Sequence, residues 1–520
     1  MKRKSTLLLL LAFCIFYSYA QPASQWAHCY GGTYDDVAKS IIQTSDGGYA
    51  VTGYSESNNG DVTGHHGGYG FADYWILKID SLGNIQWSQS YGGTQVDEGY
   101  CIIQTSDNGF AVAGYATSVN GDVTGNHGGS DMWIIKTDSV GTLQWEKCFG
   151  GSWDEVAYSL VETNDKGYVI AGSARSTDGD VGTNRGWPDV WILKIDSAAN
   201  IVWKLDCGGT QEDIAYAVSK TSDQGFIVAG SSRSNDQNVG FNYGDADYWV
   251  IKMDSNGTVQ WGKVLGGTEE DAAYAVTETR DGGYIISGTS NSDDFDITGN
   301  HASFDNWIVK LDSARNVVWQ RSFGGTGYDG GQSLAPTNDS GFIALGSSYS
   351  EDGDVTGIQT AGDYWMLKVG SDGSLQWQKA LGGTRSDAGY GIIQTSDKGF
   401  AAVGGSESHD GNVSGNHNDY TSDFWVVKIA PYTVGIGEIE DASSGIIIFP
   451  NPARDQFTIN MQQSAMARIE VYDVVGELLY SGEKPKGQKT YSLKFDFAPG
   501  LYFVKLDDGN FVSVKKLVVD

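Results

Sequence analysis

Residues 24–32 read SQWAHCYGG, and this short stretch decides how the rest of the sequence is organised. Six later stretches repeat its tryptophan and its Gly-Gly pair: IQWSQSYGG (85–93), LQWEKCFGG (143–151), IVWKLDCGG (201–209), VQWGKVLGG (259–267), VVWQRSFGG (317–325) and LQWQKALGG (375–383). Each later copy follows a segment such as DYWILKIDSLGN (73–84), whereas the first follows only a leader. The first copy is therefore the last part of a repeat that lacks its earlier parts.

The repeat is strict in length. A second tryptophan recurs at intervals of 58 residues, with a final interval of 60, at Trp75, Trp133, Trp191, Trp249, Trp307, Trp365 and Trp425. The Gly-Gly pairs recur with the same period, and the two longer intervals come from insertions around residues 65–72 and 416–422. Self-similarity at a period of this size is typical of solenoids, propellers and other repeat folds.

Each repeat contains four strand signals and no helical pattern. In the first repeat they are residues 37–45, 48–55, 73–80 and 84–91, with alternating apolar and polar residues, many aromatic residues and glycine-rich boundaries. The first two strands are joined by a hairpin such as TSDGGY (44–49), in which the aspartate binds backbone amides and glycine accepts a positive φ. Four antiparallel strands per repeat predict the blades of a β-propeller.

The order of the strands predicts how the ring closes. It repeats six times from Asp35, and the seventh copy stops after its third strand at Ile429. We expect residues 24–30 to pair with that strand as the missing fourth, because closure removes two exposed sheet edges that invite aggregation. The predicted fold is all-β: a seven-bladed β-propeller over residues 24–430, closed by the N-terminal strand.

Residues 1–20 have the pattern of a secretory signal peptide. Basic residues at 2–4 precede an apolar run at 7–17, and SYA at 18–20 has the form of a cleavage site. No later apolar run is long enough to cross a bilayer as a helix. We therefore expect export, with no membrane span in the mature chain.

Charge and cysteine usage limit the partners. The net charge is −31, and an acidic exterior without basic patches argues against nucleic acid and anionic membranes. Cys29, Cys148 and Cys207 lie just before Gly-Gly pairs in separate repeats, too far apart for the short Cα–Cα distance of a disulfide. We expect packed thiols.

An acidic residue follows the second glycine of every Gly-Gly pair by four positions. These residues are Asp36, Asp97, Glu155, Asp213, Asp271, Asp329 and Asp387. A small residue always comes two positions later, which suits a crowded axis and predicts that the first strand of each repeat is innermost. The acids would then ring the mouth of a central channel, where carboxylates suit a cation such as calcium. We favour the alternative that each carboxylate accepts hydrogen bonds from the adjacent Gly-Gly-Thr amides, and we expect no cofactor.

The long loops between the second and third strands emerge on the same face as the Gly-Gly turns. Three histidines follow GDVTG-type turns in the first, second and seventh repeats, and three aromatic residues lie in the two insertions. These candidate ligand-binding residues are His66, Tyr69, Phe71, His127, His417 and Tyr420. Imidazoles and exposed aromatic rings suit a sugar- or peptide-binding patch; ordinary loop residues are the alternative.

No sequence motif points to a catalytic site. The chain has no Walker loop, HExxH, GxSxG, CxxC pair or dinucleotide-binding fingerprint. Its inward acids recur in all repeats, so no pair is singled out as the acid and nucleophile of a glycosidase. We assign no catalytic residue and favour a secreted or surface-displayed, non-catalytic binding or adhesion protein for a glycan or an extracellular protein. A carbohydrate-active enzyme, a glycoside hydrolase or lyase, is the alternative.

Two short patterns in the repeat resemble those of known propellers. Thr-x-Asp-x-Gly followed by an aromatic residue looks like the Asp-box of sialidase-type propellers. Asp80, Gly83 and Trp87 are similar to the tryptophan-docking motif of quinoprotein-like propellers, one residue shorter. These resemblances imply blades locked by a tryptophan against their neighbours, and residues 24–430 as a whole resemble secreted bacterial β-propeller repeat proteins.

Residues 446–520, after a linker at 431–445, form a second region of alternating strands and turns, which predicts a small Ig-like β-sandwich. Particular positions in it are Pro450, Asn451, Pro452, Gly500, Tyr502, Lys505, Lys515 and Lys516. On these residues the region resembles the type A C-terminal sorting domain of the type IX secretion system of Bacteroidetes. The resemblance implies that the secretion machinery is a partner, with export through the periplasm and outer membrane to the cell surface or medium, and removal of the tail.

Overall fold

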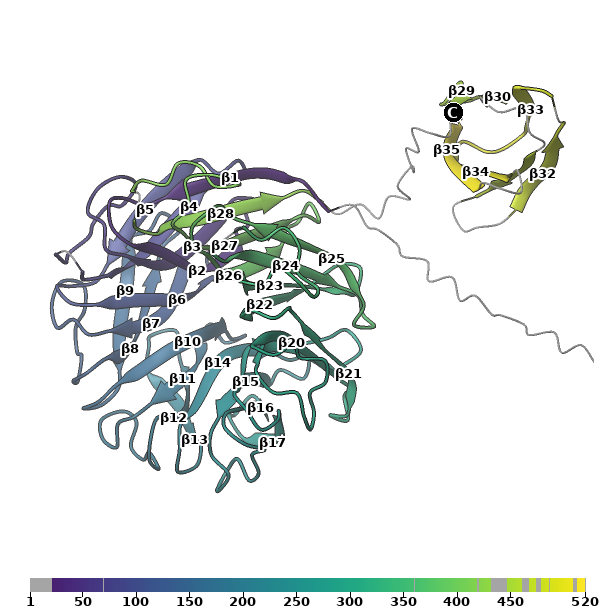
Figure 1. The fold of residues 1–520 in the computed structure, drawn as a ribbon. Helices are drawn as coiled ribbons and strands as arrows, with labels where there is room; N and C mark the ends of the chain where they lie inside the picture. The colour runs from purple at the N-terminus through teal and green to yellow at the C-terminus, as the bar shows by residue number, and fades with distance from the viewer. Residues whose placement is uncertain are drawn as a thin grey trace, which may run out of the picture. The chain divides into compact units, whose positions relative to one another are not determined.

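The computed structural model describes residues 21–68, 70–359, 361–418, 420–431, 447–460, 467–473, 478–485, 487–507 and 512–519. Within these residues all regular elements are strands, and this confirms the all-β prediction. The chain divides into two compact units, Gln21–Tyr432 and one that contains Thr433–Asp520 (Figure 1). The expected signal peptide, Tyr69 and residues 432–446, which make up nearly all of the expected linker, lie outside the described residues.

Seven four-stranded sheets, here called blades 1 to 7, form the described part of the larger unit. Blade 1 contains β2 (Asp36–Gln43), β3 (Tyr49–Ser55), β4 (Asp73–Ile79) and β5 (Ile85–Tyr91). Blade 2 contains β6 (Asp97–Gln104), β7 (Phe110–Ala116), β8 (Asp131–Thr137) and β9 (Leu143–Phe149). Blade 3 contains β10 (Glu155–Glu162), β11 (Tyr168–Ala174), β12 (Asp189–Ile195) and β13 (Ile201–Cys207). Blade 4 contains β14 (Asp213–Lys220), β15 (Phe226–Ser232), β16 (Asp247–Met253) and β17 (Val259–Leu265).

The remaining blades follow the same order. Blade 5 contains β18 (Asp271–Glu278), β19 (Tyr284–Ser290), β20 (Asp305–Leu311) and β21 (Val317–Phe323). Blade 6 contains β22 (Asp329–Pro336), β23 (Phe342–Ser348), β24 (Asp363–Val369) and β25 (Leu375–Leu381). Blade 7 contains β26 (Asp387–Gln394), β27 (Phe400–Ser406), β28 (Asp423–Ile429) and β1 (Ser24–Tyr30). We name the four strands of each blade A to D in this order.

Strand β1 completes blade 7, as the sequence predicts. It pairs antiparallel with β28, from Ser24 opposite Ile429 to Tyr30 opposite Phe424, and Figure 1 shows the purple β1 beside the green β28. Blade 1 also bonds to blade 7, because the backbone N–H of Asp36 donates to the Ser422 carbonyl at 2.6 Å. The ring is therefore closed by both ends of the repeat region, and the sheet edge of β28 is covered.

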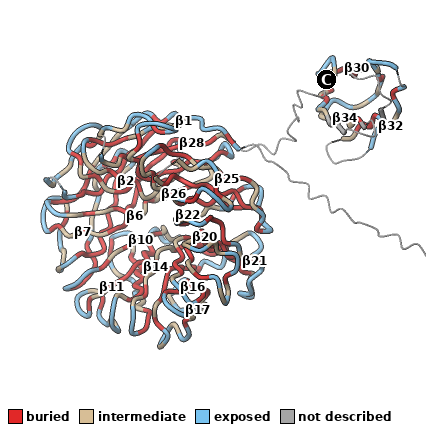
Figure 2. The backbone as a smooth tube through the Cα atoms, in the orientation of Figure 1, coloured by how far each residue is buried: buried red, intermediate tan, exposed pale blue. Residues whose placement is uncertain are grey.

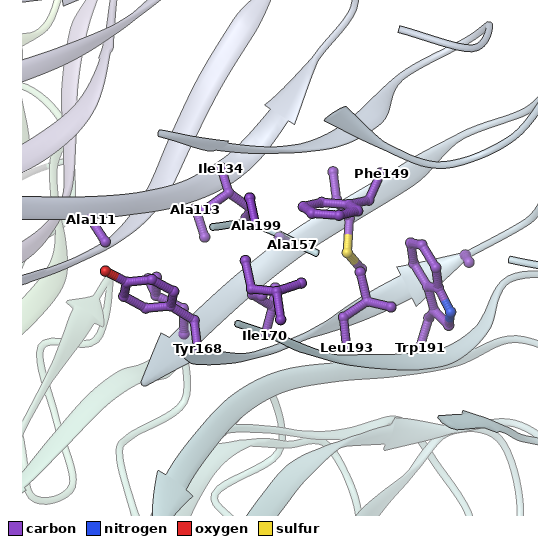
Figure 3. Close-up of a cluster of buried hydrophobic side chains, with 14 of the residues drawn as sticks. Ala111, Ala113, Ile134, Phe149, Ala157, Tyr168, Ile170, Trp191, Leu193 and Ala199 are labelled. Carbon is purple, nitrogen blue, oxygen red and sulfur yellow. The ribbon is translucent and has the colours of Figure 1, made fainter. Parts of the chain in front are cut away.

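The blades pack through their two faces. Every C strand is buried along its whole length, because it lies between strands B and D of its own sheet and between two neighbouring blades. Figure 2 shows this as a buried interior surrounded by exposed outer loops. Between blades 2 and 3, Phe149, Ile170, Trp191 and Leu193 form one such cluster (Figure 3).

A tryptophan of strand D locks each of several blades to the next. The indole N–H of Trp87 donates to the Ser139 carbonyl of blade 2 at 3.3 Å, and its ring covers Gly141. A side chain at Gly141 would clash with this ring, and its φ of 85° also favours glycine. This is the lock between neighbouring blades that the tryptophan-docking resemblance implies.

The Asp-box hairpins hold buried lysines of strand C. In blade 5 the ammonium of Lys310 lies 2.9 Å from Asp281 Oδ1 and donates to Thr279 Oγ1. The Thr279 hydroxyl in turn donates to Asp281 Oδ1. The hydrogen bonds that Asp281 accepts from Lys310 and Thr279 lower its pKa to about 2. The same pairing joins Lys78, Lys136, Lys194, Lys252, Lys368 and Lys428 to the hairpin aspartates of their blades. The Asp-box is thus a structural clamp between the A–B hairpin and strand C.

The second unit has two sheets. One contains β29 (Ile447–Phe449), β30 (Gln456–Asn460) and β33 (Thr490–Lys494). The other has the order β32 (Leu478–Lys484), β31 (Ala467–Tyr472), β34 (Gly500–Asp507) and β35 (Val512–Val519). Both sheets contribute to one core that includes Phe457, Ile459, Ile469, Val504 and Leu517, as expected of a sandwich.

Candidate functional site

The seven acids at the start of the A strands are buried hydrogen-bond acceptors. In each blade the amide of the second glycine donates to the carboxylate at 2.7–2.8 Å, as Gly32 does to Asp36 Oδ2. The Ser57 hydroxyl adds a bond of 3.0 Å to the same oxygen. Burial raises the pKa of Asp36 to about 7, although these hydrogen bonds oppose the shift. This geometry favours the interpretation that the carboxylates hold the Gly-Gly turns.

The acids lie behind the channel wall. The residues that line the central cavity begin three positions after each acid, at Lys39 in blade 1 and Tyr100 in blade 2. Within the described residues, no group of three or more His, Cys, Asp or Glu side chains has the arrangement of a metal site.

A second buried carboxylate, which the sequence analysis did not single out, begins every C strand. Asp73, Asp131, Asp189, Asp247, Asp305, Asp363 and Asp423 are these residues. Each accepts a backbone N–H from its B–C loop, as Asp247 does from Tyr243 at 2.6 Å. Burial raises the pKa of Asp247 to about 7, and the nearby Asp271 adds to the shift. A buried carboxylate pair therefore lies at each blade junction.

The three predicted histidines bind to these aspartates. Nδ1 of His127 lies 2.6 Å from Asp131, and Nδ1 of His417 lies 2.6 Å from Asp423. Burial alone would lower the pKa of His417, but the hydrogen bond to Asp423 and the negative charges of Asp423, Asp61 and Asp36 together outweigh it, and the pKa is raised. His66 makes the same contact with Asp73. Each histidine thus fixes its own loop to its own strand C.

Two of the three histidines, His66 and His417, also face an aspartate of the next blade. Nε2 of His66 in blade 1 faces Asp122 of blade 2 at 3.7 Å, and Nε2 of His417 in blade 7 faces Asp61 of blade 1 at 3.9 Å. The structure therefore places His66 and His417 at blade interfaces, and all three histidines are parts of the loop scaffold. Of the predicted aromatic residues, Phe71 is exposed and Tyr420 is 81% exposed.

The exposed aromatic residues of the propeller share one face. We call it the loop face; it consists of the B–C loops and the D-to-A connections. Within the described residues of the propeller, every strongly exposed aromatic side chain lies there: Phe71, Trp153, Trp187, Phe241, Phe295, Tyr328, Tyr349 and Tyr420. Because exposed aromatic side chains gather on this face, it is the candidate interaction surface of the propeller.

Two tryptophans and an arginine form the most prominent cluster, which we call the Trp platform. Trp153, in the connection to blade 3, is 53% exposed, and Trp187, in the B–C loop of blade 3, is 61% exposed. The guanidinium of Arg175 lies 4.8 Å from the centre of the Trp153 ring and 5.7 Å from that of Trp187. The positive charge of Arg175 is attracted to the electron-rich faces of both indoles. A second cluster joins Tyr243 to Phe241 and Phe295 at ring distances of 5.0 Å.

The central channel contains a cavity of about 510 Å³ whose wall is made by the A strands. The fourth residue of each A strand points into it, and we call these seven residues the channel ring: Lys39, Tyr100, Tyr158, Tyr216, Tyr274, Gln332 and Tyr390. Strand A has a register shift at this residue in every blade, as between Ala38 and Ser40. Such bulges re-aim side chains, and here they turn the ring residues inward.

The glycine of strand B allows the bulge. A side chain on Gly53 would lie 1.9 Å from the Val37 carbonyl, and the equivalent glycines of the other blades are as tightly placed. The repeated Gly in strand B is thus explained by the close approach of strand A.

Glu98 is an acid above the channel ring that has no counterpart in other blades. The equivalent residues are Val37, Val156, Ile214, Ala272, Gly330 and Ala388. The Tyr100 hydroxyl donates to Glu98 Oε2 at 3.0 Å. Neither Glu98 nor the channel ring was predicted from the sequence, although alignment of the repeats shows Lys39 where five repeats have tyrosine.

The predicted sorting residues tie the start of the second unit to its last strand. The Asn451 side-chain amide donates to the Lys516 carbonyl at 2.8 Å, and Asn451 Oδ1 accepts the Val518 amide at 2.8 Å. Pro450 and Pro452 both follow cis peptide bonds. Two further contacts lie in the second sheet: the Tyr502 hydroxyl donates to Ala498, and Lys505 pairs with Glu470 at 3.2 Å.

Gly500 begins strand β34, and Lys515 and Lys516 lie within β35. Residues 447–520 match the family model described as secretion system C-terminal sorting domain. The chain carries a type IX sorting tail. The tail directs export by the type IX machinery to the cell surface or extracellular space. Within the described residues there is no helix long and apolar enough to cross a membrane.

Two curated proteins and one solved structure are similar to parts of the chain. The regulatory protein FlaEY of Caulobacter vibrioides is 29% identical over 154 residues, which is 28% of this chain and 16% of FlaEY. The endo-acting ulvan lyase of Formosa agariphila is 28% identical over 192 residues, which is 34% of this chain and 36% of the lyase. The crystal structure of puromycin hydrolase aligns with 84% of this chain and 62% of its own length, at 11% identity and a TM-score of 0.44.

Proposed function

We propose that the protein is a non-catalytic, exported binding protein whose loop face holds an extracellular glycan. The observation that carries the proposal is that the strongly exposed aromatic side chains of the described propeller all lie on this face. The opposite face, made by A–B hairpins and C–D turns, presents aliphatic side chains such as Leu82 and Val140.

The Trp platform suits a sugar ring better than a flat protein surface. Indole faces pack against the C–H groups of a sugar, while neighbouring polar groups fix its hydroxyls. Trp153 and Trp187 supply the faces, Arg175 supplies donors, and Asp154, whose carboxylate lies 4.0 Å from Arg175, supplies acceptors. Since large aromatic side chains dominate binding energy at such sites, we expect this cluster to be central.

A carbohydrate-active enzyme is the second candidate. Glu98 favours it, because it is an acid found in one blade and is hydrogen-bonded to a residue of the channel ring, and one similar protein is named an endo-acting ulvan lyase. A glycosidase needs a second carboxylate at a set distance from the first. Turnover of a bound glycan is therefore the property that separates the two functions.

A glycan-array screen of the mature chain, residues 21–520, tests the proposal. Ulvan and other algal and bacterial polysaccharides are included, and each bound glycan is then incubated with the protein and assayed for new reducing ends and unsaturated products. We expect binding without turnover. Binding to no glycan would contradict the proposal, and turnover that is lost in Glu98→Gln would establish the enzyme instead.

A further inference from the structure

The channel ring breaks the sevenfold repetition on one side. Four tyrosines from successive blades, Tyr100, Tyr158, Tyr216 and Tyr274, contact one another in sequence through tilted or edge-to-face rings, at ring distances of 5.3, 5.0 and 4.8 Å. The other three residues, Gln332, Tyr390 and Lys39, come from blades 6, 7 and 1. The ring therefore has one arc of four tyrosines and a second arc in which the polar Gln332 and Lys39 lie on either side of Tyr390.

The Lys39 ammonium differs from the other buried lysines of the propeller in its surroundings. Each of the seven buried lysines of strand C is paired with an aspartate, as Lys310 is with Asp281. Nζ of Lys39 instead lies 3.6 Å from the centre of the Tyr390 ring, and no hydrogen-bond acceptor or ion-pair partner for it exists among the residues that the structure describes. Burial lowers the pKa of Lys39 to about 8, against the opposing effect of Glu98. An ammonium held in this way is stabilised by any anion that reaches it.

The cavity has the size and lining of a small-molecule site. Its volume of about 510 Å³ lies within the range of ligand pockets, about 300–1,000 Å³. Phenol rings make one side, while the Lys39 ammonium, the Gln332 amide and the hydroxyls of Ser40 and Ser333 supply polar groups. A ligand with a flat apolar face, hydroxyls and one negative charge matches this lining.

We propose that the channel ring is a subsite for a uronic acid, a sugar that carries a carboxylate. Lys39 receives the carboxylate, Gln332 a hydroxyl, and the tyrosine arc the face of the sugar ring. The inference rests on the proposed function, because it names the kind of sugar in the glycan that the loop face presents to the channel. The net charge of −31 opposes an anion at long range, but salt screens this repulsion beyond about 8 Å, and a charge-assisted hydrogen bond acts at contact.

The subsite is tested by comparing the binding of two sugars that differ only in the carboxylate. Sodium D-glucuronate and D-glucose differ at one carbon, and each is titrated into the full mature chain and followed by saturation-transfer NMR and calorimetry at pH 7. We expect glucuronate to bind about tenfold or more tightly than glucose. Its affinity should fall between pH 7 and pH 9, as Lys39 loses its proton.

Three variants separate the subsite from a general effect on folding. Lys39→Tyr introduces the residue that five other blades carry, so the ring stays filled while the preference for glucuronate disappears. Lys39→Arg keeps the charge and should keep the preference. Lys147→Gln, which removes an exposed lysine of strand β9, should change nothing. Thermal melts of all variants check that they are folded.

Three results would overturn the subsite: no binding of glucuronate, equal affinity for the two sugars, or a preference unchanged in Lys39→Tyr. The proposed function fails separately. If Trp153→Ala with Trp187→Ala abolishes polysaccharide binding but glucuronate does not bind, the loop face stands and the subsite is wrong. If glucuronate binds through Lys39 but no polysaccharide binds, the subsite stands and the glycan-binding loop face is wrong.

Discussion

At the scale of single residues, the repeat uses a small number of polar clamps seven times. The pair of Lys310 and Asp281 joins a hairpin to the buried strand C, and equivalent pairs recur in the other blades. A contact that recurs in every blade is required by the structure of the blade. The residues that differ between blades, such as Lys39, Glu98 and Gln332, are those that the fold does not require.

Removal of one clamp should destabilise the propeller measurably. In Asp281→Ala the buried Lys310 ammonium loses its carboxylate and keeps only neutral acceptors, the Thr279 hydroxyl and the Leu311 carbonyl. Since a hydrogen bond between charged groups contributes about 1.5–3 kcal/mol, we expect a loss of this size. Urea denaturation should show this loss in the free energy of unfolding. Glu351→Ala, which removes an exposed acid of a B–C loop, is the control and should change stability by less than about 0.5 kcal/mol. Equal stability of the two variants would show that the clamp has no structural role.

The same scale shows the limit of sequence reasoning. The acids at the start of strand A could be found because they keep a fixed distance from Gly-Gly. The inward direction of Lys39 and Tyr100 could not be derived from alternation, because the bulge interrupts alternation at this residue. The Trp platform was also missed, since Trp153 and Trp187 lie in different loops whose conformations follow no period.

At the scale of strands and sheets, the sequence predicts the structure closely. The four strands expected in the first repeat agree within two residues at each end with β2, β3, β4 and β5. They could be predicted because each strand is bounded by turn residues and each pattern recurs seven times. The partner of β1 could be derived because the last blade lacks a strand.

Deletion of residues 21–32 tests the role of strand β1. The truncated protein loses the strand that pairs with β28 and exposes the edge of blade 7. We expect a lower thermal midpoint and aggregation during purification. Deletion of the tail, residues 433–520, is the matched control and should leave the midpoint of the propeller unchanged. A β1 deletion that melts like the parent would contradict closure by this strand.

The buried carboxylate pairs predict that stability falls as pH rises. Burial raises the pKa of Asp247 to about 7 and that of Asp271 to about 6, well above the usual value of about 3.9 in an unfolded chain. The folded state thus binds more protons, so this contribution is complete below about pH 4 and is lost as pH rises through about 7. The hairpin acids such as Asp281, with a pKa of about 2, are ionised throughout this range.

Thermal melts at pH 5.5, 7 and 8.5 check this expectation. The midpoint should be highest at pH 5.5, and the difference should shrink in Asp247→Asn, in which an uncharged amide replaces the carboxylate. Asp254→Asn, in an exposed C–D turn, should keep the full pH dependence. A midpoint that rises from pH 5.5 to pH 8.5 would be the opposite of what the buried pairs require.

At the scale of the whole molecule, the chain combines a closed ring with a sorting tail. The tail assigns the route to the cell surface or medium. The ring gives a frame in which the Asp-box clamps and the buried carboxylate pairs recur in every blade, while the exposed aromatic side chains of the loop face and the residues of the channel ring differ between blades. The exported protein is therefore organised as a scaffold with one variable face.

We propose above that the loop face binds a glycan. The most direct measurement compares the affinity of the mature chain for its best polysaccharide from the array with that of two double variants. Trp153→Ala with Trp187→Ala removes the Trp platform, and Leu82→Ala with Val140→Ala removes exposed apolar side chains from the opposite face. We expect the Trp153/Trp187 variant to lose affinity by about tenfold or more, and we expect no change in the Leu82/Val140 variant. Equal affinities for the parent and both variants would contradict the proposal.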